Sequence, residues 1–319
     1  MTLPLSPPIA PALALTRREL PTGEDYAYEI KLDGFRCIAF VDGDSVHLQS
    51  RAAKPLHRYF PELELPSGRY VLDGEIVVRD ASGHEQFDAL QQRIHPAASR
   101  IELLSVETPA TYVAFDLLAH GDDSLLESPF VERRTALERL LADATFAEAP
   151  VELMPSTTDP ERARAWLRDA EGAIAKLRSA PYDPGKRTGM FKVKRVRTID
   201  AVLVGWRPGK KADTVGALIL GLYDGSELRV VGHCSGLTAA DKRRLVSFLA
   251  PYETGERGSA DPSRWSSGRE LEWVALRPEL VVEIDFDHIS AGRIRHGAKL
   301  RRWREDKSPR ECAFAQLFD

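Results

Sequence analysis

The stretch Glu-Ile-Lys-Leu-Asp-Gly-Phe-Arg, residues 29–36, contains the residues on which the interpretation of the rest of the chain depends. In an extended segment side chains alternate between faces, so Glu29, Lys31 and Asp33 point one way and the aliphatic residues between them the other. Gly34 permits a tight turn, and the apolar run after it predicts the next strand. Lys31 is a candidate nucleophile if neighbouring cations or a metal ion keep its amine neutral. Taken alone, the stretch is more typical of a solvated lysine beside an Asp-Gly turn. Whether Lys31 is a nucleophile therefore depends on the other residues of the chain.

The composition is that of an ordinary globular protein. Of 319 residues, 43% are hydrophobic and 29% charged, with a net charge of −4, which excludes disorder and a uniformly basic surface. A chain of this length is expected to form two domains. The three cysteines are far apart and lack a metal-binding spacing, which indicates a reducing compartment. No apolar run approaches the length of a membrane span, so we expect a cytoplasmic protein without a membrane partner.

Positive charge is concentrated in two stretches of this acidic chain. Residues 176–211 contain eleven Lys or Arg against two acids, and residues 293–310 contain eight against two. Such stretches fit a solvated face, and they also fit the contact surface of a polyanion.

Two carboxylates share one face of a predicted strand. In the Val- and Ile-rich run at residues 70–78, Asp73 and Glu75 are two residues apart and point the same way. Paired carboxylates suit a divalent metal ion, although the solvent-facing side of an edge strand can have the same sequence pattern. Phe115 lies in another β-rich run, at residues 111–118, and by itself fits the core.

Two further β-like runs place charges near their ends. Residues 171–176 begin with Glu171 and end with Lys176, and in residues 191–196 alternation puts Lys192 and Lys194 on one face. Two neighbouring ammonium groups repel each other, so a phosphate between them would relieve the repulsion. An exposed basic strand fits the local pattern equally well.

Past residue 199 the chain changes to closely spaced strands. About five strands and one helix are the inventory of a small barrel such as an OB-fold. We therefore expect an α+β protein with a domain boundary near residue 198. Residues 1–198 would form strands with packing helices, and residues 199–319 an OB-fold β-barrel.

Together these stretches resemble the covalent nucleotidyltransferases, most closely the small bacterial ATP-dependent DNA ligases of the C type. The resemblance covers nearly the whole chain and implies that the first domain is an adenylation domain of antiparallel sheets with flanking helices. One departure is Phe191 before the KxK motif, where many relatives have another large residue. Six stretches match the family's motifs in order: 31–36 (KxDGxR), 73–75, 112–116, 171–176 (EGxxxK), 192–194 (KxK) and 304–307 (RxDK). Residues 182–187 also resemble the sequence found before the KxK motif in C-type ligases.

The resemblance implies a role for each motif residue. Lys31 would attack the α-phosphate of ATP, release pyrophosphate and carry AMP as a phosphoramidate. AMP would then pass to a 5′-phosphate at a nick, and the 3′-hydroxyl would displace it. Mg²⁺ or Mn²⁺ would be the metal ion. The other implied roles are catalysis for Lys192 and Lys194; metal binding for Glu75, Glu171 and Asp73; and nucleotide binding for Glu29, Arg36, Arg51, Phe115, Lys176, Arg304 and Lys307.

Within nucleotide binding, the resemblance assigns Glu29 to the adenine amino group and Phe115 to stacking on the base. Arg36 and Arg51 would contact the ribose and phosphates. The expected partner is nicked double-stranded DNA, bound by a monomer acting near the nucleoid, with other DNA repair proteins as further partners. Three alternatives stay open: an RNA ligase, a GTP-using capping-type enzyme and a non-catalytic OB protein that binds nucleic acid.

Overall fold

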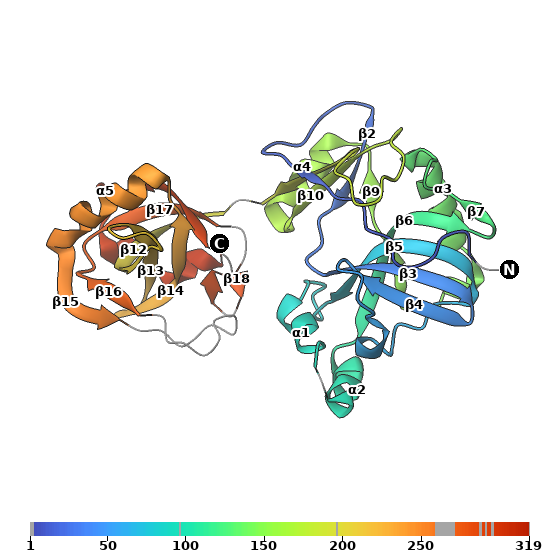
Figure 1. Cartoon of the computed structure of the whole chain (residues 1–319), viewed down its shortest axis with the longest axis horizontal. Coiled ribbons are helices and arrows are strands. Elements are labelled where there is room, and N and C mark those ends of the chain that lie inside the picture. The colour runs from blue at the N-terminus through green and yellow to red at the C-terminus, as the bar shows by residue number, and fades with distance from the viewer. Residues whose placement is uncertain are drawn as a thin grey trace. The chain divides into compact units, whose positions relative to one another are not determined.

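Two units make up the chain, Met1–Arg195 and Val196–Asp319, coloured blue to yellow and yellow to red in Figure 1. The computed structural model describes residues 3–95, 97–195, 197–258, 272–286, 289–290, 292–294 and 297–318. The expected boundary at residue 198 falls inside β12 (Arg197–Pro208), so the first strand of the second unit begins before that residue.

A mostly antiparallel six-stranded sheet forms the larger layer of the first unit. The strand order is β4-β3-β5-β6-β7, with β8 beside β6. Its central strands are runs of Val, Ile, Leu and aromatic residues because both of their faces are buried. The strands are β3 (Phe35–Gly43), β4 (Ser45–Ser50), β5 (Gly68–Val78), β6 (Ala110–His120), β7 (Asp123–Ser124) and β8 (Val151–Leu153).

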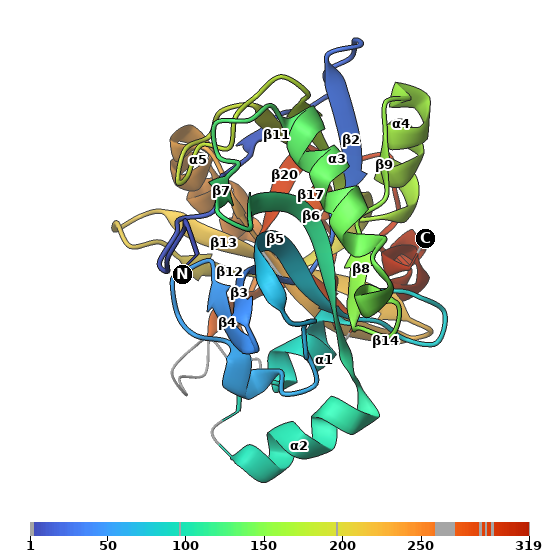
Figure 2. The same ribbon diagram turned by 90° about the vertical axis from the view of Figure 1, so that its right-hand side faces the viewer.

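Helices cover one face of this sheet. In Figure 2, α3 runs alongside β6, and Leu90 of α1 and Leu137 of α3 belong to the same buried cluster as Leu72 of β5. None of the helices in the described ranges is long and apolar enough to cross a bilayer. The helices of the first unit are α1 (Phe87–Gln92), α2 (Ala98–Glu107), α3 (Phe130–Leu141) and α4 (Pro160–Asp169).

A smaller five-stranded sheet, in the order β1-β11-β10-β2-β9, carries Glu29, Lys176, Lys192 and Lys194. The central strand is β10, and its Ile174 is paired with Glu29 on one side and Lys192 on the other. Strand pairing therefore aligns three motifs that are far apart in sequence. The strands are β1 (Leu15–Thr16), β2 (Tyr26–Ile30), β9 (Ser156–Thr157), β10 (Gly172–Leu177) and β11 (Met190–Lys194).

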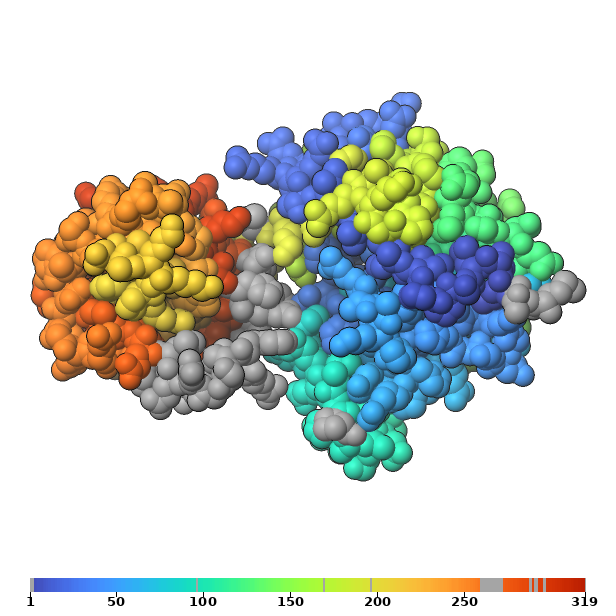
Figure 3. Space-filling model, in the orientation of Figure 1, coloured from blue at the N-terminus to red at the C-terminus, as the bar shows by residue number. Residues whose placement is uncertain are grey.

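The N-terminal segment packs on the second face of the larger sheet through residues 3–12, before residues 15–16 join the smaller sheet as β1. The dark blue residues of Figure 3 run over the surface of the first unit. Ile9 and Gln49 exchange two hydrogen bonds of 3.0 and 2.6 Å, and the backbone N–H of Leu13 donates to the Lys186 carbonyl at 2.8 Å. The segment is thus tied to both β4 and the loop before β11.

Among its described residues, the second unit forms a closed barrel with one α-helix. Its sheet has the order β13-β14-β20-β17-β12-β16-β15, and β13 also pairs with β12, which closes it. The sequence predicted about five strands. The basic stretch near the C-terminus supplies a further strand, β20, between β14 and β17. The elements are β12, β13 (Val215–Asp224), β14 (Glu227–Gly236), α5 (Ala239–Leu249), β15 (Glu253–Gly258), β16 (Trp273–Leu276), β17 (Val281–Phe286), β18 (Ile289–Ser290), β19 (Arg293–Ile294) and β20 (Ala298–Trp303).

Candidate active site

Lys31 lies where the chain crosses from the smaller sheet to the larger one. Strand β2 ends at Ile30, and the backbone N–H of Lys31 donates to the Gly172 carbonyl at 3.0 Å. Gly34 closes the connection against β5, because a Cβ on Gly34 would lie only 2.4 Å from the Ile76 carbonyl oxygen. The loop is fixed at both ends, so the position of the Lys31 amine is defined by two sheets.

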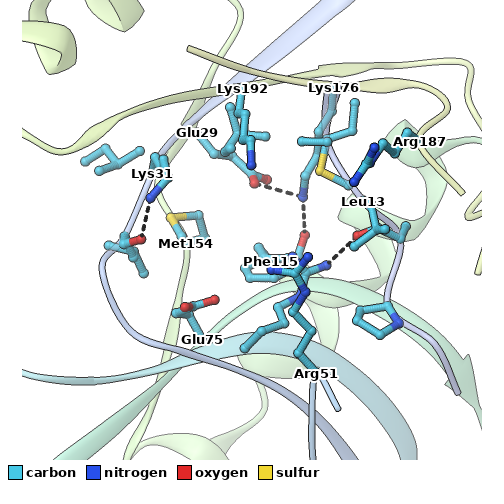
Figure 4. Close-up of a pocket in the computed structure, with 18 residues that line it drawn as sticks. Leu13, Glu29, Lys31, Arg51, Glu75, Phe115, Met154, Lys176, Arg187 and Lys192 are labelled. Atoms are coloured by element: carbon cyan, nitrogen blue, oxygen red, sulfur yellow. Dashed lines mark hydrogen bonds and ion pairs between the residues drawn. The ribbon is translucent and has the colours of Figure 1, made fainter. Parts of the chain in front are cut away.

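A cavity of about 210 Å³ opens beside Lys31 between the two sheets. Charged groups from both sheets and aliphatic side chains line it, a mixture that suits a nucleotide. Figure 4 shows its lining: Pro11, Ala12, Leu13, Ala14, Glu29, Ile30, Lys31, Leu32, Arg36, Arg51, Glu75, Phe115, Met154, Ile174, Lys176, Arg187, Met190 and Lys192.

One end of the cavity is built around the buried carboxylate of Glu29, which is 2% exposed. In Figure 4 the Lys176 ammonium lies between Glu29 and Phe115: it is 2.8 Å from Glu29 Oε2 and donates to the Phe115 backbone oxygen at 3.1 Å. Glu29 Oε1 is buried and has no hydrogen-bond partner. Burial raises the pKa of Glu29, and Lys176 opposes that rise. An unpaired buried acceptor in a purine-sized hollow fits an exocyclic amino group.

Asp73 lies beneath the cavity and does not face it. Arg36 donates to its two oxygens at 2.6 Å each, and the Tyr182 hydroxyl donates to Oδ2 at 2.6 Å. The Arg36 guanidinium in turn lies 4.5 Å from the centre of the Phe115 ring. The arrangement contradicts the metal role expected for Asp73, because protein donors already occupy both of its oxygens. Asp73 instead fixes Arg36 against Phe115.

Lys31 is paired with the first residue of the 171–176 stretch. Its Nζ is 3.0 Å from Glu171 Oε1, and Lys194 Nζ is 3.9 Å from the same oxygen. Glu171 Oε2 is buried without a hydrogen-bond partner. Burial, followed by the charges of Lys194 and Lys31, lowers the pKa of Lys192. The site thus gathers ammonium groups in excess of carboxylates, which favours a phosphate ligand.

Glu75 is the second carboxylate beside Lys31. Burial raises its pKa to about 7, while Arg36 and Lys31 pull it down. Within the described ranges no three His, Cys, Asp or Glu residues are grouped so as to hold a metal ion. Glu75 and the free oxygen of Glu171 are nevertheless the hard oxygen donors that Mg²⁺ and Mn²⁺ prefer, and phosphate oxygens commonly complete such sites. These two residues therefore fit a cation bound together with a nucleotide.

Arg304 and Lys307 belong to the second unit, where both contact one carboxylate. Arg304 Nη1 lies 2.9 Å from each oxygen of Asp200, and Lys307 Nζ lies 2.7 Å from Oδ2. Asp306 also accepts from Arg304, at 2.8 and 2.9 Å. The two cations expected to reach the nucleotide are thus held as a pair, next to the end of β20.

Family models match both units. The model described as "ATP dependent DNA ligase domain" matches residues 10–194, and that described as "ATP dependent DNA ligase C terminal region" matches residues 211–307. The chain belongs to the ATP-dependent DNA ligases. The Lys31 cavity lies within the first matched region, and Arg304 and Lys307 lie within the second.

Relatives of this ligase are similar over their full length. It is 45% identical to DNA ligase C2 of Mycolicibacterium smegmatis and 43% identical to DNA ligase C of Mycobacterium tuberculosis, each over 99% of this chain and 96% of the relative. Among solved structures, the ligase domain of M. tuberculosis LigD has a TM-score of 0.53 at 29% identity, covering 96% of this chain and 98% of that one. These relatives favour a DNA ligase over the RNA ligase, capping and non-catalytic alternatives.

The structure adds lining residues that sequence reasoning missed. Residues 11–14 form one wall, Met154 comes from the end of β8, and Ala12 accepts a hydrogen bond of 3.4 Å from Arg36. An Ala- and Pro-rich segment carries no chemical signal, so only tertiary packing shows its place. Tyr182 belongs to residues 182–187, which resemble the family, so this resemblance is a sequence signal that could have identified Tyr182.

Proposed function

We propose that this ligase seals nicks in double-stranded DNA through AMP carried on Lys31. The observation that supports this most is the placement of the Lys31 amine 3.0 Å from Glu171, at the mouth of a cavity that ends in the buried Glu29 carboxylate. A base bound against Glu29 would place its phosphates toward Lys31. Action as a cytoplasmic monomer in DNA repair, with other repair proteins as partners, belongs to the same proposal.

The purine end would use two recognition devices. Glu29 Oε1 would accept a hydrogen bond from the 6-amino group of adenine, since this oxygen has no protein donor. Phe115, which lines the cavity, would supply an aromatic face for the base. Arg36 and Arg51, both lining the cavity, would contact the ribose and phosphates.

At the phosphate end of the cavity, the reaction would require Glu171 to change its binding partner. The Lys31 amine is paired with Glu171 Oε1 at 3.0 Å, and an amine is nucleophilic only in its neutral form. A divalent cation held by Glu75 and Glu171 would neutralise phosphate charge in the reaction. Glu171 would then contact the cation in place of Lys31, while Lys192 and Lys194 would stabilise the phosphate oxygens.

The second unit would complete the first step. Arg304 and Lys307 carry the charges suited to the terminal phosphates of ATP, and Asp200 holds them as a pair. Such a role needs the two units to move relative to each other during the reaction cycle.

The test is sealing of a nicked duplex that carries a 5′-phosphate, with ATP and Mg²⁺ or Mn²⁺. We expect sealed DNA and AMP in equal amounts, and binding of the nick should weaken steeply with salt because basic residues meet the backbone. Parallel reactions should contain GTP in place of ATP, or an RNA strand in place of DNA. Preferential use of GTP or sealing only of the RNA substrate would contradict the proposal.

The raised pKa of Glu75 predicts a pH dependence that is linked to the metal ion. Only the carboxylate form binds a cation, so at low Mg²⁺ the rate of AMP transfer to Lys31 should rise with pH through about 7. Higher Mg²⁺ should move the midpoint to lower pH, because the cation competes with the proton. Initial rates of adduct formation at two Mg²⁺ concentrations measure this shift. A midpoint independent of Mg²⁺ would contradict the assignment, and Glu75→Gln should lose the shift.

Gly34→Ala should displace the Lys31 loop. The new Cβ would lie 2.4 Å from the Ile76 carbonyl oxygen and 2.7 Å from Glu75 Cγ, so the loop must move away from β5. A displacement of about 1 Å at a reacting atom costs on the order of a hundredfold in rate. We expect a loss of this size in adduct formation. Unchanged kinetics in a variant whose unfolding midpoint matches the wild type would show that the close contact is not needed.

A further inference from the structure

A second cation faces the buried carboxylate of Glu29. Arg134 Nη1 lies 3.8 Å from Glu29 Oε1, which is too far for a hydrogen bond but close enough for a strong charge interaction. Both atoms are buried, and neither has a hydrogen-bond partner. Arg134 therefore stabilises negative charge on Glu29 without donating a hydrogen bond to Oε1.

Arg134 approaches Glu29 from outside the nucleotide cavity. It belongs to α3 and lines a separate hollow of about 430 Å³, together with Glu138 and Arg178. Its Nε donates to Glu138 Oε1 at 2.7 Å, which fixes the guanidinium in place. Arg134 is not among the residues lining the nucleotide cavity, and its contact with the cavity lining is through Glu29.

The charge state of Glu29 depends on a balance among its neighbours. Burial raises the pKa of Glu29, the charges of Lys176 on β10 and Arg134 on α3 lower it, and the charge of Asp116 on β6 raises it further. Removal of one of the two cations would leave this carboxylate more readily protonated. A protonated carboxyl group can donate a hydrogen bond, whereas a carboxylate only accepts.

We propose that Arg134 is a specificity-determining residue that keeps Glu29 an acceptor, so that the cavity selects purines with an amino group at position 6. The inference rests on the proposed contact between Glu29 and the base. Inosine triphosphate differs from ATP by having an oxo group and a ring N–H in place of the amino group and N1 acceptor. A protonated Glu29 would donate to that oxo group, so loss of Arg134 should relax the discrimination.

The test is competition between ATP and inosine triphosphate for Lys31. The variants are Arg134→Met, Arg134→Lys and Arg139→Met, the last removing an exposed arginine from the same helix. The ratio of the two adducts is measured by mass spectrometry from about pH 6 to about pH 8. Because both nucleotides react at the same lysine, the ratio cancels the pH dependence of the amine and the metal ion.

We expect Arg134→Met to lower the preference for ATP by about tenfold at the acidic end and less at the alkaline end. Arg134→Lys should restore most of the preference, and Arg139→Met should match the wild type. If Arg134→Met does not fold, Glu138→Gln, which loosens the same guanidinium, should shift the ratio in the same direction. A wild-type adduct with ATP and an unchanged, pH-independent ratio in the variants would overturn the inference while leaving the proposed function intact. Absence of any wild-type adduct would overturn the proposed function itself.

Discussion

Lys31→Ala should form no covalent adduct with AMP. The variant removes the amine that lies at the mouth of the nucleotide cavity, so we expect ATP-dependent labelling and sealing to fall by more than about a thousandfold. Its side chain is 19% exposed and makes a single ion pair, so the fold should tolerate the change. Labelled ATP followed by denaturing electrophoresis measures the adduct directly.

A matched control separates this result from a general loss of positive charge. Lys54 is an exposed lysine in the turn after β4, and Lys54→Ala should label like the wild type. Binding of nicked DNA should be retained by Lys31→Ala, because the basic stretches are unchanged. A Lys31→Ala protein that still carries AMP would place the nucleophile elsewhere.

Asp73→Ala should destabilise the first unit by about 3–5 kcal/mol. Asp73 is fully buried, and its loss leaves the Arg36 guanidinium without its partner and Tyr182 without its acceptor. Urea unfolding measures the effect. The control is Asp122→Ala: Asp122 pairs with Arg69 at 2.7 Å but is 70% exposed, so its removal should cost less than about 1 kcal/mol.

The same position separates a structural role from a metal role. In Asp73→Asn the side chain keeps its shape, and we expect the Mg²⁺ concentration for half-maximal adduct formation to stay within about twofold of the wild type. Glu75→Gln should raise that concentration severalfold. An equally large shift in Asp73→Asn would restore Asp73 as a metal ligand.

The strands that carry motifs could be predicted from sequence because their periodicity is local. Residues 45–50 and 70–78 alternate or run apolar as strands do, and they form β4 and most of β5. The sequence indicated only a basic stretch where β20 lies. Its apolar alternation is weak because Lys299, Arg301 and Arg302 make up half of the strand. The helix α2 has few buried residues, so its pattern was equally weak.

The sequence indicated candidate residues for the site, but it did not indicate the contacts between them. Order and spacing of the motifs singled out Glu29, Lys31 and Glu171. The sequence pattern could not show that Asp73 pairs with Arg36 and Tyr182 and does not line the cavity, because two residues on one strand face need not have the same neighbours. The buried contact of Arg134 with Glu29 joins a helix to a strand about a hundred residues away, and only tertiary packing creates it.

The most direct test of the central claim is a single-turnover chase. The protein is incubated with ATP labelled at the α-phosphate, freed of nucleotide and mixed with a nicked duplex bearing a 5′-phosphate. We predict that label first resides on Lys31, located by peptide mapping, then passes to the DNA 5′ end, and finally appears as free AMP as the nick is sealed. Label on another residue, or an adduct on Lys31 that never passes to DNA, would contradict a DNA ligase acting through this lysine.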